Sequence, residues 1–319
     1  MNGKSAYVAL QQFCEAGDRP RRILEEAGFQ VQENRLGRRL RREEMAEVLS
    51  GADAVLAGVE PYDAELLRSL PRLKCISRCG AGTDSVDLDA ARQQGIAVLT
   101  TPDEVVEPVA QMAVAMILAL ARNLPLHKID FWQGTWKKRT GILLSEWTIG
   151  LVGFGRIGRA VGNALHPFGP RLLASDPKIG PADLPDWIHG RDLESLLRES
   201  DLVSLHAARQ PEEGPLIGER EFGWMKGGSF LVNTARGSLV DEGALLQALQ
   251  AGRLAGAALD VFESEPYQGP LARLPLVILT PHVSTLTRAS RAAMELRCAQ
   301  NLVDFFARRP VEAGGGSAR

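Results

Sequence analysis

Residues 150–162 read Gly150-Leu-Val-Gly153-Phe-Gly155-Arg156-Ile157-Gly158-Arg-Ala-Val-Gly162, and this stretch decides the fold. The apolar run before the glycines, Ile149 to Val152, is typical of a buried strand, and a helix can begin after them. Gly153 permits a tight turn, Gly155 a close approach of a ligand to the backbone, and Gly158 close packing of helix on strand. The order of strand, glycine turn and helix predicts that residues 153, 155, 156, 157 and 158 bind a dinucleotide pyrophosphate at the helix N-terminus.

A carboxylate follows at the distance expected for the ribose of such a dinucleotide. Asp176 ends the next expected strand, Leu172 to Asp176, about 20 residues after the glycines, and a carboxylate there can accept both ribose hydroxyls. The same carboxylate repels a 2′-phosphate. The cofactor expected is therefore NAD rather than NADP, although Lys178 stands two residues further on and could soften the preference.

The rest of the chain alternates short apolar runs with amphipathic ones. This rhythm predicts an α/β fold in which parallel sheets carry helices on both faces. A first series runs from Ala6 to Leu99, and a second from Thr148 to about Pro281. The second series contains six expected strands, which suit one complete dinucleotide-binding domain, at residues 149–152, 172–174, 202–205, 230–233, 256–259 and 277–280.

Three further segments lie between and after the two series. We expect a helix from Val105 to Asn123, followed by a polar loop that carries Trp132 and Trp136 and runs to Gly141. A last helix is expected from Ser290 to Ala307. The final residues, 313–319, are rich in glycine and are expected to form a flexible tail.

Composition points to a globular chain with small-molecule partners. The 319 residues are 45% hydrophobic and 24% charged, and 37 basic against 39 acidic side chains give a net charge of -2. Such a chain has no net positive field to collect nucleic acid or an anionic membrane. No secretory signal opens the sequence and the most apolar segment, residues 112–120, is too short to span a bilayer, so we expect a cytoplasmic protein. The four cysteines lack paired spacing, which favours free thiols and no metal site.

Three polar residues follow expected strands of the second series and together suit the reduction of a 2-keto acid. Open α/β sheets bind ligands at the carboxyl ends of their strands, where Arg236, Glu265 and His282 are expected. The planar fork of an arginine can grip a carboxylate and polarise a ketone. A histidine can deliver a proton to the carbonyl oxygen, and a neighbouring glutamate can orient the imidazole and favour its protonated form.

These motifs resemble the D-isomer-specific 2-hydroxyacid dehydrogenase family, especially its D-3-phosphoglycerate dehydrogenase branch. The resemblance covers nearly the whole chain, because six motifs occur in the family's order and spacing. They are Arg78-Cys-Gly-Ala-Gly82-Thr-Asp-Ser-Val-Asp87, Gly153-Phe-Gly-Arg-Ile-Gly158, Asp201-Leu-Val-Ser-Leu-His206, Val232-Asn-Thr-Ala-Arg-Gly237, Ala258-Leu-Asp260-Val-Phe-Glu263 and Thr280-Pro-His282.

The resemblance implies roles for particular residues. It implies that Arg236, Glu265 and His282 are catalytic, with His282 as the acid/base, and that Arg236 also binds substrate. It further implies that Asp260 and the backbone near His206 and Thr234 hold the nicotinamide. The loop formed by Cys79, Gly80, Ala81 and Gly82 would then offer backbone N–H groups to the substrate carboxylate.

The resemblance also implies an architecture of two doubly wound parallel-sheet domains. A flavodoxin-like substrate domain would comprise residues 1–100 and 288–319, and a Rossmann domain for NAD, residues 101–287, would be inserted between them. The helix from Val105 to Asn123 would serve a homodimer interface. Across that dimer, the loop from Lys137 to Arg139 could reach the substrate, although a solvated loop is an equal reading.

The chain departs from the family pattern around the site, which bears on the substrate. The family usually has Glu at the position of Gln111, a Pro-Leu-Thr or small apolar run at residues 208–210, and Gly soon after the histidine, where this chain has Ser284. Phosphoglycerate dehydrogenases commonly place an arginine after the third strand of the substrate domain, where this chain has Leu56-Ala-Gly-Val-Glu60. For a phosphorylated substrate, either Glu60 turns outward or the phosphate is met by Arg78, Arg209 or the loop from Lys137 to Arg139.

Several functions therefore stay open. The leading substrate is 3-phosphohydroxypyruvate, and the alternatives are a glyoxylate or hydroxypyruvate reductase and a phosphite dehydrogenase, which shares the three catalytic residues. Glu265 argues against a formate dehydrogenase, which pairs Gln with its histidine. A non-enzymatic NAD-sensing protein, like the corepressors of this fold, is the alternative from another class, but the chain lacks long disordered flanks. The basic run from Arg35 to Arg42 is followed by Glu43 and Glu44, which favours a solvated helix start over a nucleic-acid patch.

Overall fold

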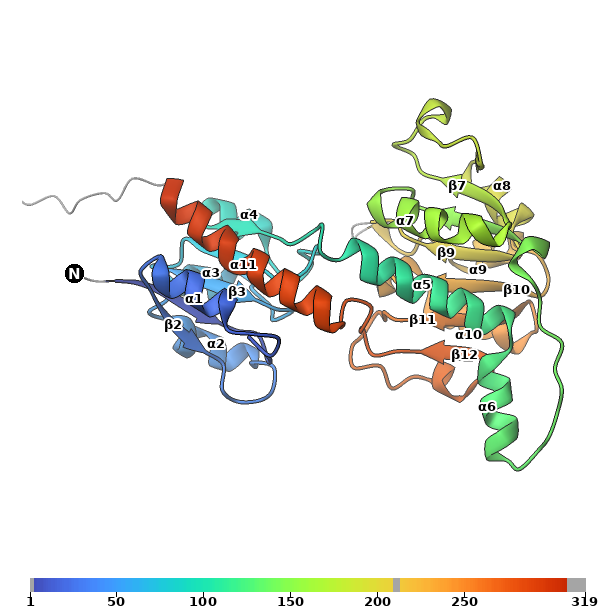
Figure 1. The fold of residues 1–319 in the computed structure, drawn as a ribbon, viewed down its shortest axis with the longest axis horizontal. Helices are drawn as coiled ribbons and strands as arrows, with labels where there is room; N and C mark the ends of the chain where they lie inside the picture. Colours follow the sequence, from blue (N-terminus) through green and yellow to red (C-terminus); the bar gives the residue numbers. More distant parts are fainter. Residues whose placement is uncertain (1–2, 209–212, 309–319) are drawn as a thin grey trace, which may run out of the picture. The chain divides into compact units, whose positions relative to one another are not determined.

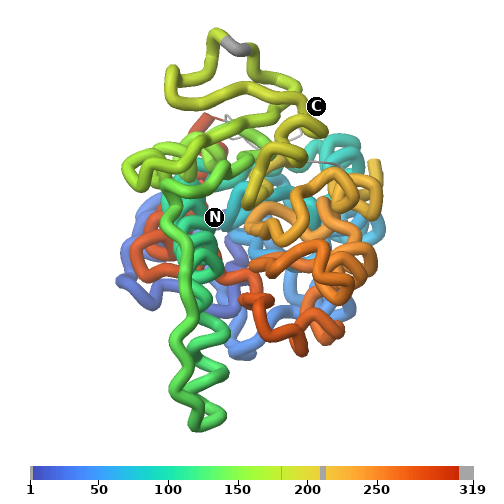
Figure 2. The backbone as a smooth tube through the Cα atoms, turned by 90° about the vertical axis from the view of Figure 1, so that its right-hand side faces the viewer, coloured from blue at the N-terminus to red at the C-terminus, as the bar shows by residue number. Residues whose placement is uncertain are grey.

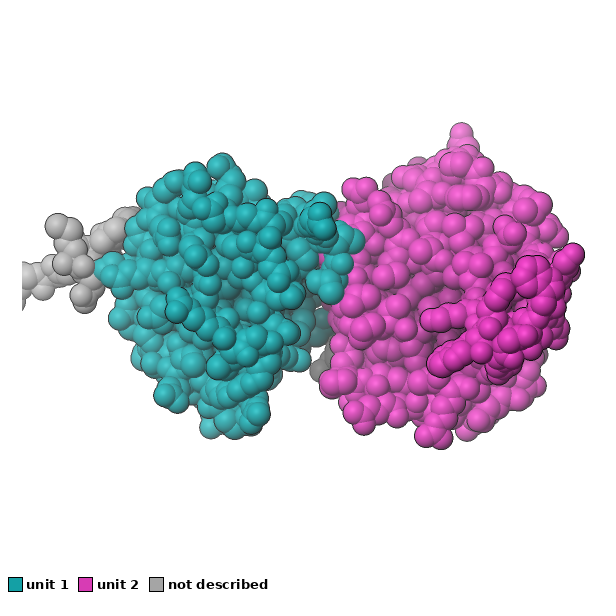
Figure 3. Space-filling model, turned by 60° about the horizontal axis from the view of Figure 1, so that its bottom comes forward, with its two compact units in different colours: residues 1–105, 286–319 teal, residues 106–285 magenta. Residues whose placement is uncertain are grey.

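The computed structural model describes residues 3–208 and 213–308, which form two compact units. Unit 1 comprises residues 1–105 and 286–319, and unit 2 comprises residues 106–285 (Figure 3). Unit 2 is thus an insertion in the chain of unit 1. From the sequence, the corresponding boundaries are expected at residues 100 and 288. The tail expected at residues 313–319 lies outside the described residues.

Unit 1 is a five-stranded parallel sheet in the order β2-β1-β3-β4-β5, which is the flavodoxin-like order. Figure 1 shows this unit, with α1 and α11 lying side by side. Helices α1 and α11 pack together on one face, and α2, α3 and α4 pack with the sheet in a second core. The elements are β1 (Lys4–Val8), α1 (Arg19–Glu26), β2 (Phe29–Glu33), α2 (Arg42–Leu49), β3 (Ala54–Ala57), α3 (Ala64–Ser69), β4 (Cys75–Arg78), α4 (Leu88–Gln93), β5 (Ala97–Leu99) and α11 (Arg288–Arg308).

The local sequence explains why these elements form. Strand β3 is buried along its whole length and reads as an uninterrupted apolar run, as expected for a parallel strand covered on both faces. Helices α3 and α4 begin after aspartates whose side chains accept backbone N–H groups, Asp63 from Leu66 and Asp87 from Ala90. These caps fix the first residues of α3 and α4, the helices that follow β3 and β4.

Unit 2 is a seven-stranded parallel sheet in the order β12-β11-β10-β9-β6-β7-β8. Strands β7 and β8 are added on one side of β6, and strands β9 to β12 are added on its other side. The position between β6 and β9 is therefore the switch point of a dinucleotide-binding fold. One core lies under α5 and α7, and a second lies under α8, α9 and α10. The elements are α5 (Val106–Ala121), α6 (Leu124–Trp132), β6 (Thr148–Val152), α7 (Arg156–Leu165), β7 (Arg171–Ser175), β8 (Ile188–Gly190), α8 (Leu193–Glu199), β9 (Leu202–Leu205), α9 (Glu219–Trp224), β10 (Ser229–Asn233), α10 (Glu242–Gln250), β11 (Leu254–Leu259) and β12 (Val277–Leu279).

The predicted fold class, two doubly wound parallel sheets, is confirmed, but two elements of unit 2 differ from expectation. Residues 124–132 form helix α6 instead of the start of a polar loop. Asn123 adopts a left-handed conformation that ends α5, and a proline in the first turn of α6 starts a new helix. Strand β8, which pairs with β7, was not predicted, because its three residues, Ile-His-Gly, are too few to show a strand pattern.

Helices α5 and α6 also bear on membrane association. No single helix among the described residues is long and apolar enough to cross a membrane. The bent pair of α5 and α6, at 61°, meets the criteria of length and composition together. The side chains of α5 that are buried, among them Ala113, Ile117 and Leu120, pack in the core of unit 2, which accounts for its apolar character.

Candidate active site

Most site residues predicted in unit 2 lie in the loops that follow the carboxyl ends of strands, and Arg156, Ile157 and Gly158 lie in the first turn of α7. Because the strands run parallel, these ends share one edge of the sheet. Six strands contribute in this way: Gly153 follows β6, Asp176 follows β7, His206 follows β9, Thr234 and Arg236 follow β10, Asp260 and Glu265 follow β11, and His282 follows β12.

Two of the three glycines of the turn leave no room for a side chain, because backbone atoms lie too close to them. Gly153 has a φ of 88°, and a Cβ built on it would lie 2.5 Å from the backbone nitrogen of Ala207. A Cβ on Gly158 would lie 2.2 Å from the carbonyl oxygen of Gly153. At Gly155, by contrast, a Cβ would meet nothing within 4 Å. The turn therefore leaves open space next to the backbone at the start of α7, where a pyrophosphate would bind.

Asp176 is fixed against this turn by two backbone hydrogen bonds. Its Oδ2 accepts the N–H of Phe154 at 2.9 Å, and its Oδ1 accepts the N–H of Lys178 at 2.9 Å. A cavity of about 250 Å³ opens beside it, lined also by Ile179 and Gly190. A carboxylate has about four acceptor positions, so Asp176 keeps capacity for the two hydroxyls of a ribose.

Two buried polar atoms near the switch point lack a hydrogen-bond partner among the described residues: Nδ1 of His206 and Oγ1 of Thr234. The other ring nitrogen of His206 lies 3.0 Å from the hydroxyl of Ser204. Burial lowers the pKa of His206 to about 4, so the ring is neutral near pH 7. Unsatisfied buried polar groups are rare in native proteins, and the amide end of a nicotinamide could satisfy both. The residues present thus fit NAD.

Arg236 is presented by a tight turn that the sequence analysis did not identify. The side chain of Asn233 accepts the N–H of Ala235 at 3.0 Å and donates to the carbonyl of Arg236 at 2.8 Å. Directly after the arginine, a Cβ on Gly237 would lie 1.9 Å from the carbonyl carbon of Phe262. The absence of that side chain lets the arginine turn touch the loop that leads to Glu265. The detectable signal is an asparagine at a strand end, which is typical of such turns.

Glu265 and His282 form the pair that the sequence predicts. Nδ1 of His282 lies 3.0 Å from Oε2 of Glu265, and Oε1 of Glu265 accepts the N–H of Phe262 at 3.2 Å. With a carboxylate at Nδ1, that nitrogen carries the proton, and Nε2 is the nitrogen that can exchange a proton with a substrate. Both side chains are about 40% exposed, at 43% and 38%. The pair is therefore accessible to a ligand.

Asp260, which the resemblance assigns to the nicotinamide, is instead hydrogen-bonded to the segment that carries His282. Its carboxylate is fully buried and accepts four hydrogen bonds from the segment that carries His282. The donors are the hydroxyl of Thr280 and the N–H of Val283 on Oδ1, and the N–H and hydroxyl of Ser284 on Oδ2. These four donors occupy the acceptor positions of the Asp260 carboxylate, which the resemblance assigns to the nicotinamide. Ser284, noted only as a departure from the family pattern, is part of this support.

The predicted carboxylate-binding loop lies in unit 1, directly after β4. Two of its N–H groups are already occupied: that of Cys79 donates to the carbonyl of Ala57, and that of Gly80 to the hydroxyl of Thr101, each at 2.8 Å. Within the described residues, the N–H groups of Ala81 and Gly82 make no hydrogen bond. Those two are therefore the donors that remain for an anion.

Other residues considered in the sequence analysis are engaged elsewhere. Both Nε and Nη2 of Arg139 bind the carboxylate of Asp130, at 2.7 and 2.9 Å, so its charge is compensated within unit 2. The exposed side chain of Gln111 donates to Glu107 one turn earlier in α5. Arg209, one of the candidates for meeting a phosphate, lies outside the described residues.

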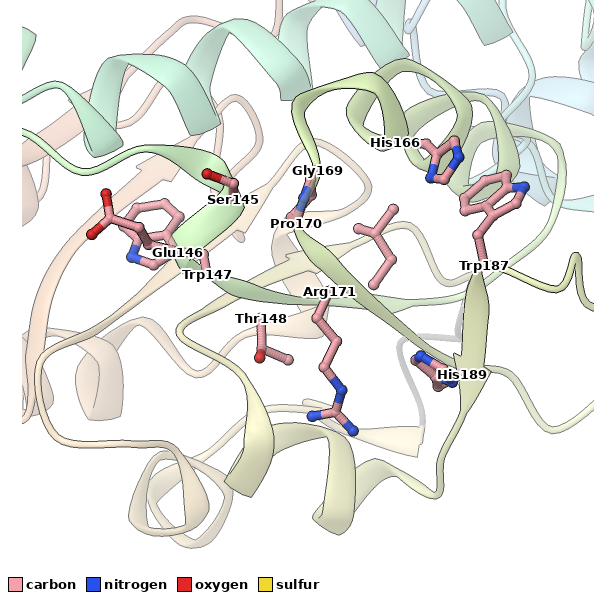
Figure 4. A pocket seen from close by; sticks show the side chains of 11 residues that line it. Ser145, Glu146, Trp147, Thr148, His166, Gly169, Pro170, Arg171, Trp187 and His189 are labelled. Carbon is pink, nitrogen blue, oxygen red and sulfur yellow. The ribbon is translucent and has the colours of Figure 1, made fainter.

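A cavity of about 440 Å³ lies at the opposite edge of the sheet in unit 2 (Figure 4). Its walls include Thr148 and Arg171, the first residues of β6 and β7, together with a stacked pair of rings, His166 and Trp187, whose centroids are 4.4 Å apart. The guanidinium of Arg171 is paired with Glu199 at 2.8 Å. Since the predicted site residues of unit 2 gather at the carboxyl ends of the strands, this cavity plays no part in their chemistry.

The geometry at the carboxyl edge of the sheet in unit 2 defines a class of protein. A dinucleotide-binding glycine turn in the same unit as an arginine and a histidine–glutamate pair is typical of a nicotinamide-dependent dehydrogenase that acts on a hydroxy or keto acid. The family description "D-isomer specific 2-hydroxyacid dehydrogenase, NAD binding domain" matches residues 114–284. The chain belongs to this family, and its cofactor is NAD.

Individual relatives agree with this assignment. The chain is 37% identical over 273 residues to a glyoxylate reductase of Thermococcus litoralis, covering 82% of each chain. It is 35% identical to a D-3-phosphoglycerate dehydrogenase of Mycobacterium tuberculosis, with 86% of this chain matching only 54% of that longer protein. Among solved structures, the D-lactate dehydrogenase of Aquifex aeolicus, complexed with NAD and lactic acid, is 28% identical with a TM-score of 0.83 and covers 95% of this chain and 96% of that one.

We expect Asp176→Ala to weaken NAD binding and to narrow the preference for NAD over NADP. The ribose hydroxyls lose their acceptor, and the 2′-phosphate of NADP loses a repulsive charge. The measurement is the dissociation constant of NADH and of NADPH by fluorescence titration. Asp186→Ala, which removes an exposed carboxylate from the same unit, is the matched control. An unchanged ratio of the two constants in Asp176→Ala would contradict the assigned role.

Proposed function

We propose that this enzyme interconverts a small 2-keto acid and its D-2-hydroxy acid with NADH and NAD. The observation that carries the proposal is the 3.0 Å contact of His282 with Glu265, next to an arginine turn in contact with the glutamate loop. When bound, NADH supplies a hydride. The protein must then bind the substrate and donate a proton to it.

Each residue has a task in this proposal. Arg236 binds the carboxylate and polarises the ketone oxygen, because its guanidinium offers several donors in one plane. Nε2 of His282 gives a proton to that oxygen during reduction and takes it back during oxidation. Glu265 holds Nδ1 and compensates the charge of the protonated ring. The free N–H groups of Ala81 and Gly82 are proposed to bind the substrate carboxylate.

The substrates in the names of the relatives are small acids of two kinds. The glyoxylate reductases among them act on a 2-keto acid with no further anionic group, whereas the phosphoglycerate dehydrogenases act on one that carries a phosphate. This chain spans about half the length of the latter. We propose a glyoxylate or hydroxypyruvate type of substrate, with a 3-phosphoglycerate type as the second candidate because of the 35% identity.

A screen of NADH oxidation tests the proposal. Glyoxylate, hydroxypyruvate, pyruvate, 3-phosphohydroxypyruvate and phosphonate-bearing 2-keto acids are offered under identical conditions, and phosphite is offered with NAD. We expect turnover of at least one 2-keto acid. Turnover of phosphite alone would replace the proposed reaction by phosphite oxidation. Tight NADH binding without any turnover would support a sensing role instead.

We also propose that the protein is a homodimer that uses α6. Helix α6 and the segment after it extend beyond the sheet of unit 2 (Figure 2), and three aromatic side chains there are exposed, Phe131 at 65%, Trp132 at 86% and Trp136 at 79%. Such a concentration of exposed aromatic surface is typical of an interface.

The dimer is expected to give twice the chain mass of 34.6 kDa by light scattering at micromolar concentration. Trp132→Glu places a charge in the proposed interface and is expected to yield monomers, whereas Leu36→Glu, at an exposed leucine of unit 1, leaves the mass unchanged. A monomeric wild-type protein would contradict the proposal.

We place the enzyme in the cytoplasm. All four cysteines are free thiols, and Cys75, Cys79 and Cys298 are buried. Free thiols are typical of proteins in a reducing compartment. Fractionation of cells that produce the native protein would test this location.

A further inference from the structure

The loop that we propose to bind the substrate carboxylate is fixed before and after its two free donors. These donors are the N–H groups of Ala81, which is exposed, and of Gly82. After them, Val86 pairs with the buried Tyr62 in an isolated parallel bridge. Before them, Gly80 is buried and both of its backbone polar groups are hydrogen-bonded. The two donors therefore belong to a short segment with fixed ends.

Thr101 makes both hydrogen bonds to Gly80. Its Oγ1 accepts the N–H of Gly80 at 2.8 Å, and its own N–H donates to the carbonyl of Gly80 at 3.0 Å. Thr101 is fully buried, with 0% of its surface exposed. The carbonyl of Gly80 and the N–H of Ala81 belong to one planar peptide group. A contact that fixes this carbonyl therefore also fixes the direction of the Ala81 N–H.

The segment that carries Thr101 is itself held by α11. Thr101 lies two residues after β5, which pairs in parallel with β4. Nδ2 of Asn301 donates to the carbonyl of Thr100 at 3.1 Å, and the hydroxyl of Ser290 donates to the carbonyl of Glu104 at 3.1 Å. Both donors lie on α11 and are buried. The segment after β5 is thus hydrogen-bonded to α11 before and after Thr101, which gives the loop a rigid support.

We propose that Thr101 is a positioning residue that presets the Ala81 and Gly82 donors for the substrate carboxylate. The inference rests on the proposed function and deepens it by naming the residue that acts through Gly80 on the substrate-binding loop. Donors that are already in place bind an anion more tightly, because less ordering is needed when it arrives.

The loss of Oγ1 would act on binding more than on chemistry. It leaves the buried N–H of Gly80 without an acceptor, which favours a shift of the loop. The substrate carboxylate does not change during the reaction, so its hydrogen bonds contribute alike to the bound substrate and to the transition state. Their weakening should raise KM more than it lowers kcat.

Thr101→Val tests the proposal, because valine has nearly the shape of threonine but no acceptor oxygen. We expect KM for the best 2-keto acid to rise about tenfold or more and kcat to change by less than about threefold. The inhibition constant of oxamate, which keeps the carboxylate but is not reduced by NADH, should rise by the same factor as KM. Neither constant depends on the fraction of protein that is folded. Thr101→Ser keeps a hydroxyl acceptor, and its KM should lie within about twofold of the wild-type value.

Ser77→Ala is the matched control. It removes another fully buried hydroxyl of unit 1, which accepts Nδ2 of Asn301 at 3.3 Å. It should lower the melting temperature and leave KM unchanged. If Thr101→Val does not fold, Thr101→Ala removes the same oxygen and carries the same expectation.

Three results would overturn the inference and leave the proposed function standing. They are an unchanged KM and oxamate constant in an active variant that lacks the oxygen, an equal rise of KM in Thr101→Ser, and an equal rise in Ser77→Ala. Absence of turnover of every 2-keto acid by wild type overturns the proposed function and this inference with it.

Discussion

Replacing His282 by asparagine should lower kcat by about 10²- to 10⁴-fold while NADH still binds. Asparagine can occupy similar space and hydrogen-bond Glu265, but it cannot give a proton to the ketone oxygen. The glycine turn and Asp176 follow other strands, β6 and β7, so the cofactor-binding residues stay in place. Steady-state kinetics with the best 2-keto acid and a fluorescence titration of NADH give the two quantities.

The controls separate chemistry from folding. His189→Asn changes an exposed histidine of the same unit near the opposite edge of the sheet and should leave kcat unchanged. Glu265→Gln keeps a hydrogen-bond acceptor for Nδ1 but removes the charge, so its kcat should fall between those of wild type and His282→Asn. Wild-type turnover in His282→Asn would remove this histidine from the mechanism.

The parts of the site that depend on local sequence could be predicted. The glycine turn needs residues without side chains at fixed spacing, and the clashes that a Cβ would meet at Gly153 and Gly158 show the physical reason for that spacing. The parallel sheets follow from alternating apolar and amphipathic runs. Since carboxyl ends of parallel strands share an edge, residues far apart in sequence could be assigned to one place.

The parts that depend on long-range hydrogen bonds could not be predicted. The four donors on Asp260 come from residues 20 to 24 positions later in the chain, and no local pattern shows which carboxylate they will reach. The burial of Glu60 also could not be predicted from the local sequence. A charged residue in a loop suggests solvent, and only its packing shows that it lies inside unit 1.

Helix α6 was missed for a different reason. Its sequence, Leu-Pro-Leu-His-Lys-Ile-Asp-Phe-Trp, carries large apolar side chains that stay exposed, so it lacks the one-sided apolar pattern of a helix packed on a core. A helix with exposed apolar side chains does not show the pattern by which a helix is recognised from its own core. Its exposed aromatic residues instead support the proposed dimer.

The second large effect is expected at Asp260, and it follows from how the four donors are divided. One backbone N–H, from Val283, points at Oδ1, and another, from Ser284, points at Oδ2. In Asp260→Asn, either orientation of the amide sets its NH₂ group against one of these N–H groups. A buried donor left without an acceptor costs about 1–3 kcal/mol, so the Thr280–Ser284 segment should shift.

Such a shift of the Thr280–Ser284 segment should lower kcat as well as the stability of the fold. Displacing a catalytic group by about 1 Å can cost about 10²-fold in rate, and we expect a loss of that size in kcat for Asp260→Asn. Ser284→Ala removes one hydroxyl donor but keeps both N–H bonds, so its loss should be smaller. Asp201→Asn is the structural control, because Asp201 accepts the N–H of Thr148 and binds Lys226 at the opposite edge of the sheet. It should lower the melting temperature but leave kcat unchanged.

The affinity for NADH decides between the two roles of Asp260. If the carboxylate acts by positioning His282, the dissociation constant of NADH should change by less than about threefold in Asp260→Asn, because all its acceptor positions already serve the Thr280–Ser284 segment. If it holds the nicotinamide, NADH binding should weaken along with kcat. A fall in kcat with unchanged NADH affinity, absent from Asp201→Asn, would establish the positioning role, and a loss of NADH affinity equal to the loss of kcat would refute it.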